Sequence, residues 1–123
     1  MKNLYRQKIG KWGEAIASEY LAANGCNILA ANVRTSEGEI DLVVELAGET
    51  RFVEVKSRTS RKFGYPEESI TVVKYEHMVA AAESYLSKLE KSIEDWHLDV
   101  VAVYGKPESG IIEVEWFKDV EVS

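Results

Sequence analysis

Several features that define common protein classes are scarce or absent in this 123-residue sequence. Cys26 is the only cysteine, so one chain cannot form an internal disulfide or a cysteine-based zinc site. No segment approaches the roughly 18 apolar residues of a membrane span, and the charged N-terminus is not followed by the apolar run of a signal peptide. We therefore expect a cytoplasmic protein without a membrane partner.

Positive charge is also scarce. The formal net charge of −6 argues against a protein that holds nucleic acid by bulk electrostatics, because neutralising phosphate requires a positive surface. The charge is unevenly placed: residues 1–62 contain ten Lys or Arg and eight Asp or Glu, whereas residues 63–123 contain five and thirteen. A local basic face is compatible with this pattern, and the acidic C-terminal portion is expected to face away from nucleic acid.

The chain does contain enough apolar residues, 46%, for one hydrophobic core, and it is too short for two ordinary domains. We expect a single domain over residues 1–123. Apolar residues recur at helical spacing over residues 3–24 and 71–91, and Thr71 is placed to cap the second helix. Five segments have the composition of strands: residues 26–33, 39–46, 51–56, 97–104 and 111–117.

This order of elements, α-β-β-β-α-β-β, predicts an α/β fold with a central mixed five-stranded sheet flanked by helices. Short turns join the first three strands, which indicates an antiparallel meander. The helix between the third and fourth strands is long enough for a crossover connection, which makes those two strands parallel.

Charged residues interrupt two of the strand segments. With a two-residue turn at residues 48–49, which places glycine first, Asp41 lies opposite Lys56. Because side chains alternate along a strand, Glu54 projects from the same face. Two carboxylates this close repel each other unless a cation lies between them, and their hard oxygen atoms suit Mg²⁺ or Mn²⁺. We therefore predict a metal site at Asp41 and Glu54, with Lys56 beside it.

Other groups near this pair are candidates for the same chemistry. Glu39 lies two residues before Asp41 on the same face, where it is either an extra ligand or a solvated edge residue. The carbonyl of Val55 can add a metal ligand, and Glu14 can bind the metal directly or through water if the first helix packs beside the hairpin. Lys56 can orient the attacking water or stabilise the charged transition state of phosphodiester hydrolysis.

Simpler roles are open for these residues. Asp41 and Glu54 also fit an exposed sheet face, on which Lys56 balances the acids in an ordinary cross-strand ion pair. His77 and His97 are too far from any paired ligand pattern to suggest zinc. Both histidines are expected at the surfaces of their elements.

Five further residues are candidate substrate contacts, each with a simpler alternative. Arg58, Arg61 and Lys62 follow the proposed metal site in a polar loop, where they contact phosphate or remain solvated. Asn32 and Arg34 are alternate residues on the first strand. They contact a nucleic-acid backbone or pair with local carboxylates, and the sequence does not separate these roles.

Several short motifs occur in order along most of the chain: Gly10-x-x-Gly13-Glu14, Asn32-Val33-Arg34, Gly38-Glu39-Ile40-Asp41, Phe52-Val53-Glu54-Val55-Lys56-Ser57-Arg58, Phe63-Gly64, Thr71-x-x-Lys74 and Asp99-Val100-Val101. Each is weak alone, but jointly they are specific. In this combination the sequence resembles the bacterial proteins of the YraN (UPF0102) family, which is placed in the PD-(D/E)xK nuclease superfamily near the archaeal Holliday-junction resolvases.

The resemblance implies a restriction endonuclease-like fold and a role for each matching residue. Asp41 and Glu54 match the first and second metal ligands of the superfamily, and Lys56 matches its catalytic lysine. Glu14 matches the acidic residue of the first helix. Lys74, at the start of the second helix, resembles a position that steadies phosphate or the catalytic water in related nucleases.

We predict a metal-dependent DNA endonuclease that hydrolyses phosphodiester bonds, either directed to junction or branched DNA or less selective. The chief alternative is a catalytically silent nucleic-acid-binding or assembly protein on the same fold, acting in DNA recombination, repair or uptake. An RNA nuclease differs only in substrate, and the sequence shows no aromatic platform that decides the matter. A homodimer is compatible with cutting both strands, which needs two active sites.

Overall fold

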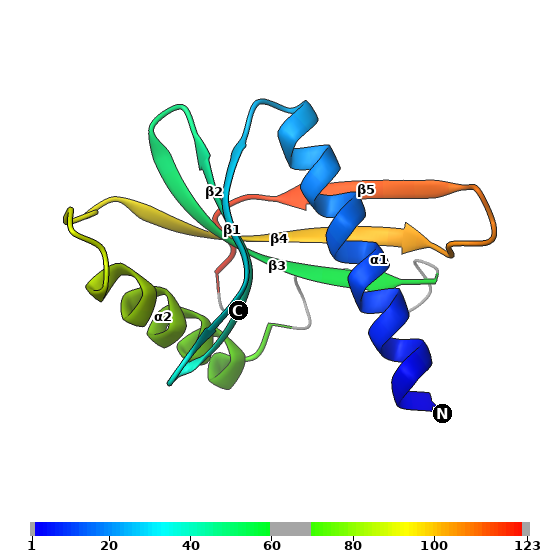
Figure 1. Cartoon of the computed structure of the whole chain (residues 1–123), viewed down its shortest axis with the longest axis horizontal. Coiled ribbons are helices and arrows are strands. Elements are labelled where there is room, and N and C mark those ends of the chain that lie inside the picture. Colours follow the sequence, from blue (N-terminus) through cyan, green and yellow to red (C-terminus); the bar gives the residue numbers. More distant parts are fainter. Residues whose placement is uncertain (1, 60–69, 122–123) are drawn as a thin grey trace.

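The structure is a computed structural model that describes residues 2–59 and 70–121. Its elements follow the chain in the predicted order (Figure 1). They are α1 (Lys2–Ala23), β1 (Asn27–Thr35), β2 (Gly38–Leu46), β3 (Glu49–Arg58), α2 (Val72–Ser87), β4 (Trp96–Gly105) and β5 (Ile112–Phe117). Within the described ranges, no helix is long and apolar enough to cross a membrane.

The strands form one mixed sheet in the order β1-β2-β3-β4-β5. β1, β2 and β3 pair antiparallel, because short turns connect them. β3 and β4 are parallel, since α2 lies between them in the chain, and β5 returns antiparallel to β4. The predicted fold class is confirmed: the protein is a mixed α/β structure with a five-stranded sheet and two flanking helices, consistent with a restriction endonuclease-like fold.

The two faces of the sheet carry two separate hydrophobic cores. Val43 and Phe52 lie in the core that contains Met78 of α2. Val53 faces the other way and lies in the core that contains Leu21 of α1. β4 is buried along most of its length, as expected for a strand that is covered on both faces. The two helices therefore cover opposite faces of the sheet.

The second helix begins where the sequence predicts it. The hydroxyl of Thr71 accepts a hydrogen bond from the backbone N–H of Lys74, with an oxygen–nitrogen distance of 3.1 Å, as an N-cap residue does. The helix ends at Ser87, before the predicted end at Lys91. This cap fixes Lys74 in the first helical turn.

The β2–β3 hairpin differs from the prediction in its turn. The two turn residues are residues 47–48, both with positive φ (51° and 84°), and not residues 48–49. A turn with two positive φ angles matches the right-handed twist of the flanking strands. Continuing the residue pairs back from this turn places Asp41 opposite Glu54. The prediction that Lys56 lies opposite Asp41 was wrong. Because the register differs by two residues, every side chain keeps its predicted face.

Gly10 and Gly13 of α1 have different surroundings, so replacing each with alanine should change the stability of the protein in opposite directions. A Cβ atom at Gly13 would clash with the hydroxyl of Ser57, whereas a Cβ atom at Gly10 would meet nothing within 4 Å. We expect Gly10→Ala to stabilise the protein by about 0.5–1 kcal/mol, because glycine weakens a helix interior. Gly13→Ala should destabilise it by about 1–2 kcal/mol through overpacking. Urea denaturation measures both; equal stabilisation would contradict close packing of α1 on β3.

Candidate functional site

The predicted metal ligands lie where β2 and β3 stop pairing. Their backbone pairing ends at Leu42 and Val53. Just beyond this pair, the carboxylate of Asp41 accepts a hydrogen bond from the backbone N–H of Val55, with an oxygen–nitrogen distance of 2.8 Å. The two strands diverge from here (Figure 1). We call the site formed by Asp41, Glu54 and Val55 the β2–β3 fork.

Two surface hollows meet at the β2–β3 fork. The α1 hollow, of about 500 Å³, is lined by residues that include Glu14, Asp41 and Glu54. The α2 hollow, of about 330 Å³, is lined by residues that include Asp41, Glu54 and Lys74. Helices on opposite faces of the sheet therefore bring Glu14 and Lys74 to the same pair of carboxylates.

Two lysines are paired with Glu54. Its Oε1 atom lies 2.7 Å from Nζ of Lys74 and 3.5 Å from Nζ of Lys56. The side chains of Glu54 and Lys56 are only 15% and 16% exposed. Charges this well shielded from water interact more strongly than a surface ion pair does. The fork therefore contains Asp41, Glu54 and Lys56 on one face, with Lys74 added from α2.

Asp41 is held in surroundings that disfavour its charge. Burial and the negative charge of Glu54 raise the pKa of Asp41 from 3.8 to about 7. The hydrogen bond from Val55 lowers this pKa, Glu14 adds to the rise, and the charge of Lys74 opposes it. The fork thus concentrates negative charge that the surrounding protein compensates only in part.

The two lysines beside Glu54 differ in how firmly they hold their protons. Burial lowers the pKa of Lys56 more than the charge of Glu54 raises it, and the charge of Lys74 lowers it further. Burial also acts against the charge of Lys74, but the hydrogen bond to Glu54 and its charge raise the pKa of Lys74 above the usual value. Lys56 is therefore the easier of the two to deprotonate.

The raised pKa of Asp41 predicts that Asp41→Asn stabilises the protein at pH 8 and not at pH 4. The folded protein holds a proton on Asp41 up to about pH 7, whereas the unfolded chain loses it near pH 4, so wild-type stability falls as pH rises through this window. Asparagine does not ionise, so the stability of Asp41→Asn does not fall in this way. One pKa unit corresponds to about 1.4 kcal/mol, and we reduce the total because Asp41 is not fully buried. We therefore expect the free energy of unfolding at pH 8 to rise by about 1–3 kcal/mol. Thermal melts in EDTA from pH 4 to 8 measure it; a pH-independent difference would contradict the shift.

Arg34 and Glu39 pair with each other across β1 and β2. Nε of Arg34 lies 3.6 Å from Oε1 of Glu39, and both side chains are strongly exposed. Glu39 also lines the α2 hollow, but Arg34 lines neither hollow of the fork. Arg34 thus takes part in the simpler alternative, a surface ion pair, which is worth little to stability.

The other predicted substrate contacts are placed in different ways. Arg58 lines the α1 hollow, next to the fork. Asn32 lines a separate hollow of about 290 Å³, which it shares with Glu14. Arg61 and Lys62 lie outside the described residues. Arg58 is therefore the arginine of this group that lines the same hollow as the carboxylates.

A second polar cluster lies at the opposite end of β3. Glu49, Asp95 and His97 place their ligand atoms within 4.8 Å of one another, and no other such group of three is found in residues 2–59 and 70–121. This cluster could hold a metal ion. His97 does not lie on an open surface as expected: its ring is 2.9 Å from Glu49, 3.3 Å from Asp95 and 2.6 Å from Asp119.

This cluster was not predicted from the sequence because Glu49 is distant in the chain from Asp95 and His97. The parallel pairing of β3 and β4 places Arg51 beside His97, and so brings Glu49 near the start of β4. No local motif encodes that register. The register of the parallel pair β3 and β4, had it been predicted, would have placed Glu49 near Asp95 and His97.

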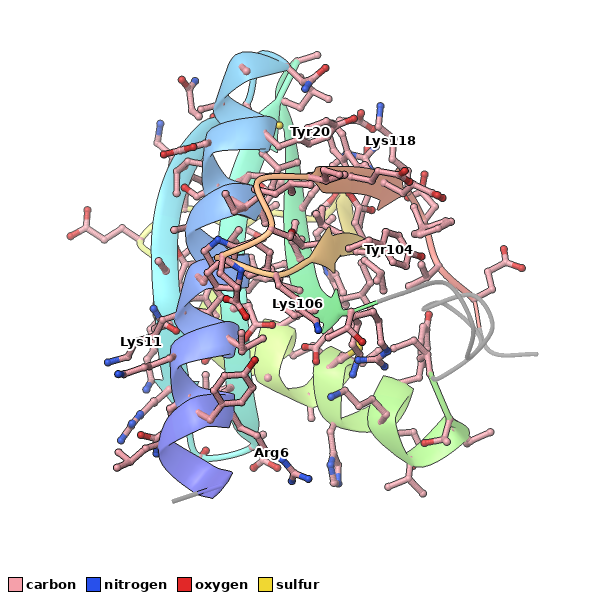
Figure 2. All side chains as sticks on the ribbon, turned by 90° about the vertical axis from the view of Figure 1, so that its right-hand side faces the viewer. Arg6, Lys11, Tyr20, Tyr104, Lys106 and Lys118 are labelled. Atoms are coloured by element: carbon pink, nitrogen blue, oxygen red, sulfur yellow. The ribbon has the colours of Figure 1, made fainter. Side chains whose placement is uncertain are left out.

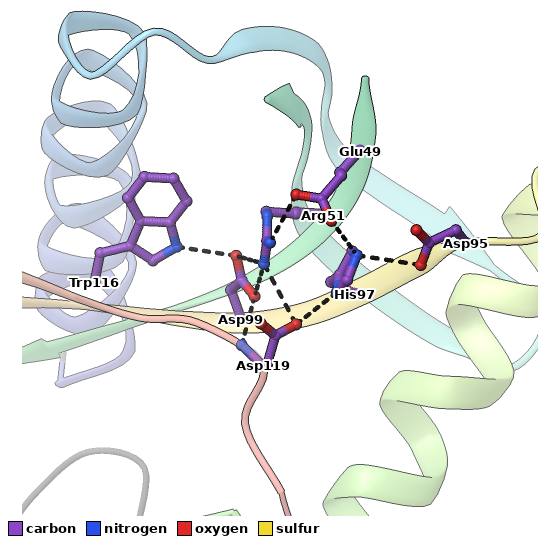
Figure 3. A network of polar contacts seen from close by, with 7 residues as sticks. All are labelled: Glu49, Arg51, Asp95, His97, Asp99, Trp116 and Asp119. Carbon is purple, nitrogen blue, oxygen red and sulfur yellow. Dashed lines mark hydrogen bonds and ion pairs between the residues drawn. The ribbon is translucent and has the colours of Figure 1, made fainter. Parts of the chain in front are cut away.

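Buried charges beside this cluster hold the C-terminal segment to the sheet (Figure 3). Nη1 of Arg51 donates to Oδ1 of Asp99 at 3.0 Å, and the two side chains are 6% and 0% exposed. Asp99 also accepts hydrogen bonds from Nε1 of Trp116 and from the backbone N–H of Asp119, each at 2.9 Å. Asp99 thus joins β3, β4, β5 and the segment after β5.

The mixed sheet with a helix on each face and an acidic fork between two strands defines an α/β protein consistent with the restriction endonuclease-like fold. The model of the Uncharacterised protein family UPF0102 matches residues 13–103. A UPF0102 protein of Symbiobacterium thermophilum is 39% identical over 102 residues, which are 83% of this chain and 86% of the relative. One of Caldicellulosiruptor saccharolyticus is 34% identical over 114 residues, 93% and 97% of the two chains. The chain belongs to the UPF0102 family, as its motifs indicated.

Proposed function

We propose that this protein is a metal-dependent DNA endonuclease that hydrolyses phosphodiester bonds at the β2–β3 fork. The observation that carries the proposal is the meeting of Asp41 and Glu54 at the fork, with the ammonium group of Lys56 3.5 Å from Glu54. Phosphodiester hydrolysis needs ligands for a divalent cation and a positive charge beside the phosphate. These three side chains supply both.

The donor atoms of the fork fit Mg²⁺ or Mn²⁺. Asp41 and Glu54 would hold the ion through carboxylate oxygens, which these hard cations prefer. A pKa of about 7 at Asp41 is a sign of negative charge that a divalent cation would compensate. The N–H and C=O of one residue in a strand point to the same edge, so the carbonyl of Val55 faces the same edge of β3 as the N–H that bonds Asp41. It would be the third protein ligand.

The residues around the fork divide the work of hydrolysis. When bound, the cation supplies charge neutralisation at the phosphate and lowers the pKa of the attacking water. Lys56 stabilises the negative charge of the transition state as an ammonium group. Lys74 contacts the phosphate from the first turn of α2. Glu14 orients water from the side of the α1 hollow. Water adds to phosphorus and gives a proton to solvent, the phosphorus–oxygen bond to the leaving strand breaks, and that oxygen takes a proton from solvent.

One observation favours the alternative of a catalytically silent nucleic-acid-binding protein. Nζ of Lys74 lies 2.7 Å from Oε1 of Glu54, so an ammonium group already neutralises a proposed ligand oxygen. A site in which a ligand oxygen is paired in this way could bind a strand without cleaving it. The two functions differ in whether Lys74 moves to the phosphate when a metal ion and DNA are present.

A cleavage assay with matched lysine variants tests the proposal. Single-stranded, duplex and four-way-junction DNA are incubated with wild type, Lys56→Ala and Lys88→Ala, each with Mg²⁺, Mn²⁺ or EDTA. Lys88 is an exposed lysine at the far end of α2, so it controls for loss of a positive charge. Metal-dependent cleavage that is lost only in Lys56→Ala supports the proposal. Equal cleavage by all three proteins would trace activity to a contaminant, and binding without cleavage would support the silent alternative.

A further inference from the structure

The α1 hollow is larger than a metal site requires. Its volume of about 500 Å³ lies in the range of pockets that hold organic ligands, roughly 300–1,000 Å³. Besides the carboxylates its lining includes Tyr5, Arg6 and Arg58. These three side chains have no role in holding a cation.

The α1 hollow is lined by charges of both signs. Arg6 lies about 12 Å from Glu14 along the helix axis, and Arg58 lies about 13 Å beyond Glu54 along β3. Both arginines line the hollow together with Glu14, Asp41 and Glu54. The arginines suit phosphate groups, whereas the carboxylates suit a metal ion.

Tyr5 adds an aromatic ring to the lining of the α1 hollow. Its side chain lines the hollow although the residue is 55% exposed. Stacking of a nucleic-acid base on such a ring is worth about 1–3 kcal/mol. The bases of a continuous duplex already stack on each other, so only an unpaired base can use the ring without the cost of unstacking.

A third hollow adjoins the α1 hollow. Thr59 lines both, and the third hollow, of about 500 Å³, is also lined by Tyr104 and Lys106. Figure 2 shows Arg6 at the lower end of α1 and Tyr104 and Lys106 above it, near the end of β4. Lys106 therefore adds a basic side chain beyond the α1 hollow, whereas Tyr104 is only 5% exposed and forms part of the wall.

We propose that the α1 hollow binds unpaired nucleotides of a DNA strand beside the cut site, with one base stacked on Tyr5 and phosphates at Arg6 and Arg58. This inference rests on the proposed function and specifies its substrate. The preferred substrate is single-stranded DNA or the single-stranded segment of a branched molecule. A continuous duplex fits the hollow poorly, because it offers no free base to Tyr5.

Binding of labelled DNA by ring-removing and ring-keeping variants tests this inference. Fluorescence anisotropy in EDTA, where no metal-dependent cleavage occurs, compares a single strand with the blunt duplex of the same sequence. We expect Tyr5→Ala to weaken single-strand binding by about 5- to 100-fold, and Tyr5→Phe to retain the affinity because it keeps the ring. Duplex binding should change little in either variant. Leu4→Ala is the matched control, since Leu4 is 62% exposed on the same helix and does not line the hollow.

The outcomes separate this inference from the proposed function. Unchanged single-strand binding in Tyr5→Ala, or an equal loss in Leu4→Ala, would overturn the inference even if wild type cleaves DNA. Tyr5-dependent binding by a wild-type protein that cleaves no DNA would support the strand site and overturn the endonuclease. Circular dichroism of each variant confirms that the helix end is intact.

Discussion

Asp41→Asn and Glu54→Gln are each expected to lower metal-dependent DNA cleavage by about 10³-fold, as the loss of one essential charge-stabilising group does in other enzymes. Both replacements keep the shape of the side chain, and asparagine can still accept the hydrogen bond from Val55. What they remove is the negative charge that would hold a divalent cation. The measurement is the initial rate of cleavage of labelled DNA at saturating Mg²⁺.

The second cluster supplies the control for this prediction. Asp95→Asn removes a carboxylate that is 80% exposed and lies near His97, away from the fork. It should cleave DNA at the wild-type rate. The reverse result, in which Asp95→Asn is inactive and Asp41→Asn active, would move the metal centre from the fork to the cluster of Glu49, Asp95 and His97.

Asp99→Ala is expected to lower the free energy of unfolding by about 3 kcal/mol, the lower end of the usual cost of removing one partner of a buried ion pair. Arg51 is 6% exposed and would keep only Glu49 and Asp119 as partners, whose side chains are 39% and 56% exposed. The donors of Trp116 and of the backbone of Asp119 would lose their acceptor as well. Urea denaturation with a tryptophan signal measures the loss.

The double variant Arg51→Met/Asp99→Leu is the control for this ion pair. It removes both charges, so it should recover the part of the loss that comes from the charge of Arg51, but not the part that comes from the donors of Trp116 and Asp119. A loss below about 1 kcal/mol in Asp99→Ala would mean that the buried pair does not hold the C-terminal segment to the sheet.

Local patterns were sufficient to predict the elements and their faces. Helical spacing of apolar residues and the cap at Thr71 located the two helices, and the capping hydrogen bond is present. The turn of the β2–β3 hairpin was misplaced by one residue, because Gly48 fits either position of a two-residue turn. The faces of Asp41 and Glu54 were still predicted correctly, since the side-chain period of a strand is two.

Features that depend on long-range register were not predictable in the same way. Asp99 was recognised as part of a motif, but its partner Arg51 is 48 residues away and reaches it only through the parallel pairing of β3 and β4. The approach of Glu14 and Lys74 from opposite faces follows from the divergence of β2 and β3, which no local pattern encodes. Burial of polar groups and cross-strand register are properties of the folded chain as a whole.

The central claim, that Asp41 and Glu54 share one divalent cation, is tested most directly by the location of bound Mn²⁺. Crystals of the wild-type protein soaked in MnCl₂ would be measured near the manganese absorption edge. We predict an anomalous peak within about 2.0–2.6 Å of a carboxylate oxygen of each residue, the range for hard cations bound by oxygen. A peak between Glu49, Asp95 and His97, with none at the β2–β3 fork, would contradict the claim.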